Sequence, residues 1–95
     1  MFILIAYDIN TETEAGKTRL RKVAKECQNY GFRVQNSLFE CHLMPADEVL
    51  LRTKLKGIIN EDTDSVRIYY LGKKERCVSI GKTTAINVSD DTLIL

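Results

Sequence analysis

The chain has no pair of closely spaced cysteines, because its three cysteines are Cys27, Cys41 and Cys77. This spacing excludes the usual zinc-site patterns, and an odd number of cysteines argues against a disulfide framework. We expect free thiols in a protein of the reducing cytoplasm. The sequence also lacks a P-loop, a GxGxxG motif and an HExxH motif, which removes three familiar classes of nucleotide and metal site.

Long apolar runs are missing as well. The opening segment, residues 1–6, is apolar, but Tyr7 and Asp8 follow at once and no basic residue precedes it. It is too short for a signal peptide or a membrane span, so we expect no contact with a membrane. A strong charge of one sign is also absent, since the net charge is +1. Overall charge therefore neither supports nor excludes nucleic acid as a partner.

The 95 residues suffice for one domain. Apolar residues make up 44% of the chain and charged residues 28%, which is ordinary for a soluble globular protein. A domain of this size buries only about 60–65% of the surface of its unfolded chain. We therefore predict one domain, residues 1–95, with a modest core that oligomerisation would help.

The first half of the chain predicts a strand, a helix and two short strands. Phe2–Tyr7 is a continuous apolar run, typical of a central strand. Apolar residues then recur at helical spacing up to Tyr30, and Gly31 is expected to end this helix as a C′ glycine. Strands at Arg33–Gln35 and Leu38–Leu43 fit the next segment best, with one long kinked strand as the alternative.

The second half predicts a helix and a strand. Pro45 followed by two carboxylates marks a helix start, and Ser65–Leu71 alternates like a strand. We also predict a short strand at Cys77–Ile80 and an apolar tail at Thr92–Leu95. The order βαββαβ predicts an α+β, ferredoxin-like sheet with both helices on one face. The other face and the tail need cover, so we predict a homodimer whose tail pairs with an edge strand of the partner.

Asp8 is the sharpest candidate for chemistry. It follows a buried strand and opens a loop, which should place its carboxylate at the edge of the sheet. Mg²⁺ prefers oxygen ligands and keeps several waters, so two Asp8 carboxylates brought together by a dimer axis would form a plausible site. The alternative, which pattern alone favours, is that Asp8 only caps a turn or the following helix.

A second feature is the crowding of basic residues on the first helix, namely Lys17, Arg19, Arg21, Lys22 and Lys25. Arg33 follows the helix. Clustered arginines and lysines can bind phosphates, which predicts a nucleic-acid-binding role for these side chains. The alternative is a solvated helix face with a few ion pairs along it.

Three segments carry a resemblance to a known family. They are the strand end Tyr7-Asp8-Ile9, the run RLRKVAKECQNYGFRVQNSLFEC from Arg19 to Cys41, and DSVRIYYLG from Asp64 to Gly72. Together they resemble CRISPR-associated protein 2, and YGFRVQNSLFE is the most specific element. The longer loop at Thr11–Gly16 is similar to the group that accompanies type I-C systems.

The resemblance implies a function in CRISPR adaptation. It implies a symmetric dimer in which Asp8 of each chain holds one Mg²⁺, and a metal-dependent endonuclease acting on RNA or on duplex DNA. It also implies a partner, the CRISPR integrase (CRISPR-associated protein 1). By position, the residues that match the family's recurrent site residues are Tyr7, Asp8, Arg19, Arg33, Ser37 and Phe39.

The implied roles are specific. Asp8 is the metal ligand, Tyr7 lines the cleft wall, Ser37 hydrogen-bonds a phosphate oxygen, and Arg19 and Arg33 neutralise phosphates. Two other readings stay open at this point. One is a non-catalytic adaptor that bridges integrase dimers and binds duplex DNA. The other is a toxin-like ribonuclease or a regulator on the same fold.

Overall fold

The computed structural model describes residues 1–72, 78, 80 and 81. Its helices and strands follow the predicted order βαββαβ. They are β1 (Phe2–Asp8), α1 (Glu14–Tyr30), β2 (Gly31–Gln35), β3 (Leu38–His42), α2 (Pro45–Ile58) and β4 (Ser65–Leu71). The two-strand reading of the segment after α1 is therefore confirmed.

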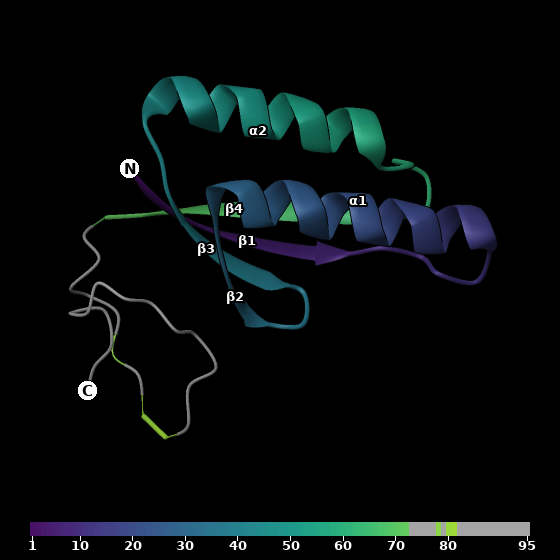
Figure 1. Ribbon diagram of the computed structural model, residues 1–95, viewed down its shortest axis with the longest axis horizontal. Coiled ribbons are helices and arrows are strands. Elements are labelled where there is room, and N and C mark those ends of the chain that lie inside the picture. Colours follow the sequence, from purple (N-terminus) through teal and green to yellow (C-terminus); the bar gives the residue numbers. More distant parts are fainter. Residues whose placement is uncertain (73–77, 79, 82–95) are drawn as a thin grey trace.

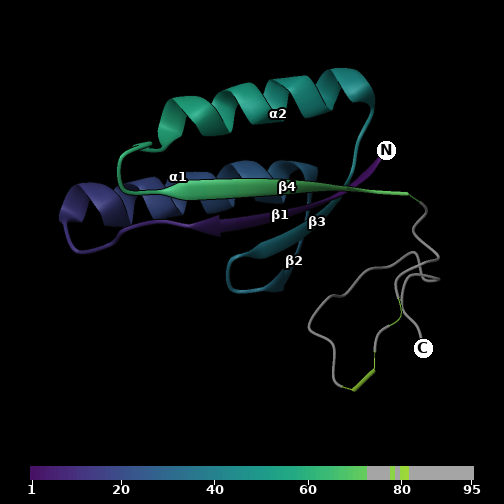
Figure 2. The same cartoon turned by 180° about the vertical axis from the view of Figure 1, so that it is seen from behind.

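The four strands form one sheet in the order β2-β3-β1-β4, and all neighbouring strands are antiparallel. β1 is central, as its continuous apolar sequence predicts. Both helices cover the same face (Figure 1). Seen from behind, β4 and β1 lie in front of α1, and neither helix covers that side (Figure 2). This confirms the ferredoxin-like α+β fold.

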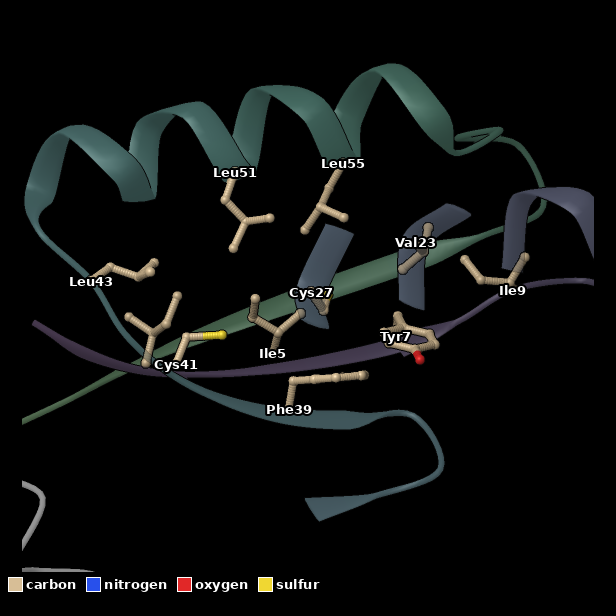
Figure 3. Packing of buried hydrophobic residues seen from close by; sticks show 11 residues of the cluster. Ile5, Tyr7, Ile9, Val23, Cys27, Phe39, Cys41, Leu43, Leu51 and Leu55 are labelled. Carbon is tan, nitrogen blue, oxygen red and sulfur yellow. The ribbon is translucent and has the colours of Figure 1, made fainter. Parts of the chain in front are cut away.

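The core fills the space between the sheet and the two helices. Alternate residues of β1, namely Ile3, Ile5 and Tyr7, point toward the helices and are buried. Leu51 and Leu55 of α2 point down toward the sheet (Figure 3). The period of two along a strand sends the intervening β1 residues, including Asp8, to the other face. The core thus fixes which face each β1 side chain occupies.

The ends of α1 differ from the expected caps in one respect. At the start, the Thr13 side chain accepts a hydrogen bond from the Gly16 N–H (3.0 Å), an ordinary N-cap. At the end, the prediction that Gly31 is a C′ glycine is wrong, because its φ of −162° is extended and it already begins β2. Glycine is needed there for space, since a Cβ would overlap the Glu40 carbonyl oxygen and crowd Cys41 Sγ.

Gly16→Ala is expected to lower stability by about 1–3 kcal/mol, the usual range for overpacking. A Cβ at Gly16 would overlap the backbone carbonyl of Asn10, and backbone cannot move aside as a flexible side chain can. The matched control is Gly57→Ala in α2, where a Cβ meets nothing within 4 Å. That change should be neutral or stabilise by up to about 1 kcal/mol. Urea unfolding of both variants measures the difference, and equal midpoints would contradict the packing argument.

Two sequence predictions fall outside the described residues, the strand at Cys77–Ile80 taken as a whole and the tail at Thr92–Leu95. Within the described part of the chain, neither helix has the length and apolar character needed to cross a membrane.

Candidate functional site

A cleft of about 560 Å³ lies beside the end of β1, between α1 and the turn that joins β2 to β3. Three segments supply its walls: the end of β1 with the loop after it, one face of α1, and the β2–β3 hairpin. Its lining residues are Tyr7, Asp8, Ile9, Thr11, Leu20, Arg21, Ala24, Arg33, Asn36 and Ser37. The cleft therefore brings together Tyr7, Asp8, Arg33 and Ser37, four of the residues predicted from the sequence.

Hydrogen bonds fix the β2–β3 turn against the end of β1. The Tyr7 backbone N–H donates to the Ser37 carbonyl oxygen (3.1 Å). The Tyr7 hydroxyl donates to the Asn36 carbonyl oxygen (3.3 Å), and Arg33 Nη1 donates to the same oxygen. One carbonyl thus accepts from two side chains, and Ser37 is held next to the residue that precedes Asp8.

Tyr7 is a buried wall of the cleft. Only 5% of its surface is exposed, and its ring stacks on that of Phe39 with centroids 6.1 Å apart. Burial raises the pKa of the Tyr7 hydroxyl, although the positive charge of Arg33 opposes this shift. The hydroxyl is therefore protonated at neutral pH and acts as a hydrogen-bond donor. This placement suits a positioning role better than a general base.

Arg33 is exposed, but its guanidinium is oriented by contacts beneath it. Its Cζ lies 5.0 Å from the centroid of the Phe39 ring, a cation–π distance, and Phe39 itself is fully buried. With the bond to Asn36, these contacts hold a positive charge over the cleft before any ligand binds. Phe39 therefore supports the site from below.

Asp8 is the exposed last residue of β1, paired across the sheet with Ser65 of β4. Among the described residues, no arginine or lysine forms an ion pair with its carboxylate. Of the described residues that line the cleft, Asp8 is the one that is acidic. Its negative charge is consequently available to a cation from outside the chain.

The donor chemistry of the cleft fits Mg²⁺. Its side-chain oxygen groups include the Asp8 carboxylate and the hydroxyls of Ser37 and Thr11, and the described residues of the lining include neither cysteine nor histidine. One carboxylate is too few by itself, and within the described residues no group of three or more histidines, cysteines, aspartates or glutamates is placed to hold a metal. A site on this cleft would need the Asp8 of a second chain.

Four of the predicted basic residues lie elsewhere. Arg19 Nε donates to Asp64 Oδ2 (2.8 Å), and that carboxylate is fully buried. Lys17 forms an exposed ion pair with Glu14 (3.2 Å). Lys22 and Lys25 are exposed on α1 outside the cleft lining. The Arg19 guanidinium is thus engaged by a buried carboxylate and does not line the cleft.

Arg21, one of the α1 basic residues predicted to bind phosphates, lines the cleft. Asp64 has a role that the sequence alone did not assign. Asp64 is a buried hub that accepts from the backbone N–H groups of Asn10 and Asn60 (2.9 Å each) as well as from Arg19. No spacing or motif distinguishes Asp64 from the other acidic residues of its loop.

Cys27 and Cys41 are buried free thiols. Burial raises the pKa of each to about 12, with the neighbouring Cys41 adding to the shift at Cys27 and Glu40 adding to that at Cys41. A thiol with so high a pKa holds almost no thiolate at neutral pH. These two cysteines therefore serve packing and supply no nucleophile.

Comparison with known proteins gives a consistent family. The family model described as CRISPR associated protein Cas2 matches residues 1–77. The CRISPR-associated endoribonuclease Cas2 of Chlorobaculum tepidum is 56% identical over 72 residues, which cover 76% of this chain and 75% of that protein. The CRISPR-associated endonuclease Cas2 of Halalkalibacterium halodurans is 47% identical over 92 residues, which cover 95% and 96%.

Solved structures agree. The crystal structure of Streptococcus pyogenes Cas2 at pH 6.5 is similar with a TM-score of 0.76 and 53% identity, covering 85% of this chain and all of that one. A structure described as "Crystal structure of cas2" covers 100% of this chain and 98% of that one, with a TM-score of 0.70 and 33% identity.

Proposed function

The chain belongs to the CRISPR associated protein Cas2 family, and from this premise we propose that it is a metal-dependent endonuclease of CRISPR adaptation that hydrolyses phosphodiester bonds. One observation carries the proposal. The cleft is lined by Asp8, a carboxylate with no ion-pair partner among the described residues, by Arg33, whose guanidinium is already oriented, and by the Ser37 hydroxyl. A ligand for a cation and ligands for a phosphate thus line the same cleft, as hydrolysis of a phosphodiester needs.

Each residue has a distinct role in this proposal. Asp8 holds the metal ion, and Arg33 neutralises a phosphate through its fork of N–H donors. Ser37 donates a hydrogen bond to a phosphate oxygen, while Tyr7 forms the wall and positions the turn. When bound, Mg²⁺ supplies an activated water and stabilises charge on the scissile phosphate.

We propose that the active form is a homodimer. The sheet face opposite the helices carries exposed apolar side chains, including Tyr69 (44% exposed) and Leu71 (40% exposed). Leu4 and Ala6 of β1 lie on the same face, in register with Tyr69 and Arg67. A second copy on this face would bury these side chains and would supply the second Asp8 that the metal needs.

Further partners follow from the family. We propose that the dimer works in the cytoplasm, binds DNA or RNA and associates with the CRISPR integrase (CRISPR-associated protein 1). The non-catalytic adaptor is the rival reading, and the two differ in a measurable way. An adaptor binds nucleic acid but leaves it intact whether or not metal is present.

Removal of the metal tests the proposal. Purified full-length protein is incubated with labelled single-stranded RNA and with duplex DNA, before and after treatment with EDTA. We expect cleavage of at least one substrate, its loss on chelation, and its return when Mg²⁺ is added in excess. Cleavage that persists in EDTA would overturn the metal-dependent mechanism, and intact substrates under all conditions would favour the adaptor.

A further inference from the structure

The cleft contains two arginines that come from distant parts of the chain, Arg33 of β2 and Arg21 of α1. Asp8 is the other charged residue among the described residues of the lining. In this part of the chain two positive charges therefore stand against one negative charge, and a bound cation at Asp8 would make the cleft more positive still. Such a cleft attracts a ligand with more than one negative charge.

Arg21 is exposed and has most of its hydrogen-bonding capacity to spare. Its Nη2 donates to the Thr18 hydroxyl one turn earlier on α1 (3.1 Å), which holds the side chain along the helix. In the described part of the chain it forms no ion pair. Arg19, two residues earlier, differs in this respect, because its guanidinium forms an ion pair with Asp64. An arginine carries five N–H donors, so Arg21 keeps several for a ligand.

The cleft lining also includes apolar side chains. They are Leu20 and Ala24 of α1 and Ile9 after β1, together with the polar Thr11, Asn36 and Ser37. A nucleic-acid strand offers a matching surface, with charged phosphates and less polar faces of sugar and base between them. Arg21 and Arg33 would then contact phosphates of the same strand, while the apolar residues lie under the sugar or base between them.

We infer that Arg21 is a second phosphate-binding residue of this cleft, which positions the strand together with Arg33. The inference rests on the proposed function, since it assumes that the cleft receives nucleic acid. It assigns Arg21 to binding and to alignment of the strand, and it leaves the hydrolytic step to the metal ion at Asp8.

The test is a binding measurement that does not depend on cleavage. A fluorescein-labelled single-stranded oligonucleotide is titrated with full-length protein in EDTA at several salt concentrations, and anisotropy reports the affinity. Arg21→Gln should weaken binding about tenfold, the loss typical of one charge-assisted hydrogen bond. The slope of log affinity against log salt should become shallower by about 0.7 for each phosphate that the variant no longer neutralises.

Two further variants sharpen the result. Lys25→Gln removes the same charge from an exposed position on the same helix outside the cleft lining, and it should change affinity by less than about twofold. Arg21→Lys restores the charge without the planar fork, so it should recover the salt slope but only part of the affinity. Unfolding temperatures of all three should match that of the wild type, because neither exposed side chain has a buried partner.

The outcomes separate the inference from the proposed function. If Arg21→Gln and Lys25→Gln have the same affinity and the same salt slope, the inference about Arg21 is wrong. The proposed function would still stand in that case, provided that EDTA abolishes cleavage by the wild-type protein. A wild-type protein that neither binds nor cleaves any of the nucleic acids overturns both. The inference is supported if Arg21→Gln loses affinity while Lys25→Gln does not, and if Arg21→Lys restores the salt slope of the wild type. This result does not depend on whether the dimer cleaves.

Discussion

Asp8→Asn is expected to reduce Mg²⁺-dependent cleavage by about a thousandfold. The substitution keeps the size of the side chain but removes the negative charge that Asp8 brings to the cleft lining. A metal ion that activates water and stabilises phosphate charge contributes several kcal/mol to the barrier, and each 1.36 kcal/mol is about a factor of ten in rate. Cleavage of a labelled substrate at saturating Mg²⁺ measures the loss.

The fold should be unaffected by this change. Asp8 is exposed and has no ion-pair partner among the described residues, so Asp8→Asn should alter stability by less than about 0.5 kcal/mol. Asp62→Asn is the matched control, because Asp62 is also an exposed aspartate but lies outside the cleft lining. If Asp8→Asn cleaves at the wild-type rate with Mg²⁺ present, the proposed metal ligand is wrong.

The proposed dimer predicts that both chains contribute to one metal site. Two Asp8 carboxylates at close range would repel each other unless a metal ion lies between them. Mixed dimers, in which one chain is wild type and the other carries Asp8→Asn, would lose most of the activity, because each metal site draws on both chains.

Asp64→Ala is expected to destabilise the fold by about 3–5 kcal/mol, the range for breaking a buried ion pair. The Asp64 carboxylate is fully buried and accepts hydrogen bonds from the Arg19 guanidinium, the Asn10 and Asn60 N–H groups and the Thr63 hydroxyl. Small domains have only about 5–15 kcal/mol of stability in total. Urea unfolding at neutral pH measures the loss, and Asp64→Asn provides a milder variant that keeps the shape.

The same carboxylate makes stability depend on pH. The hydrogen bond from Arg19 lowers the pKa of Asp64 far below its usual range, and the N–H groups of Asn60 and Asn10 and the Thr63 hydroxyl add to this against the cost of burial. In the unfolded chain the pKa returns to about 3.9. The unfolded state therefore binds the proton first, so this contribution is complete above about pH 5 and falls as the pH drops through 4 and below.

The control for Asp64 lies two residues away. Asp62→Ala removes an exposed carboxylate from the same loop and should change stability by less than about 0.5 kcal/mol. It should also leave the acid dependence of unfolding unchanged. Equal unfolding midpoints for Asp64→Ala and Asp62→Ala would mean that the buried pair contributes nothing to stability.

The fold was predictable because its signals are local. The apolar run of β1, the helical spacing on α1, and the proline and carboxylates at the start of α2 each follow from a few neighbouring residues. In β3, Phe39 and Cys41 are buried and Glu40 between them is partly exposed, as the alternation of side chains along a strand requires. The reason for glycine at position 31 was not predictable from its neighbours in sequence, because the residues that leave no room for a Cβ belong to β3, about ten residues further along the chain.

The site was predictable only in part, because the tertiary structure decides which charged side chains form ion pairs. Arg19 and Arg21 look alike in sequence, yet one faces the buried Asp64 and the other faces the cleft. Helical spacing separates them by roughly 200°, but nothing in the sequence says which side meets an acidic partner. Asp64 itself sits 45 residues from Arg19, so only the assembled fold reveals the pair.

The alternation of Tyr7 and Asp8 along β1 has a consequence for how the sheet assembles. A slip of one residue in strand pairing would carry the Asp8 carboxylate into the apolar interior beside Phe39 and turn the phenol ring outward. Burying a lone ionised carboxylate costs several kcal/mol. The residue proposed to hold the metal thus also disfavours misalignment of β1 during folding, and Asp8→Leu would remove that penalty along with the metal ligand.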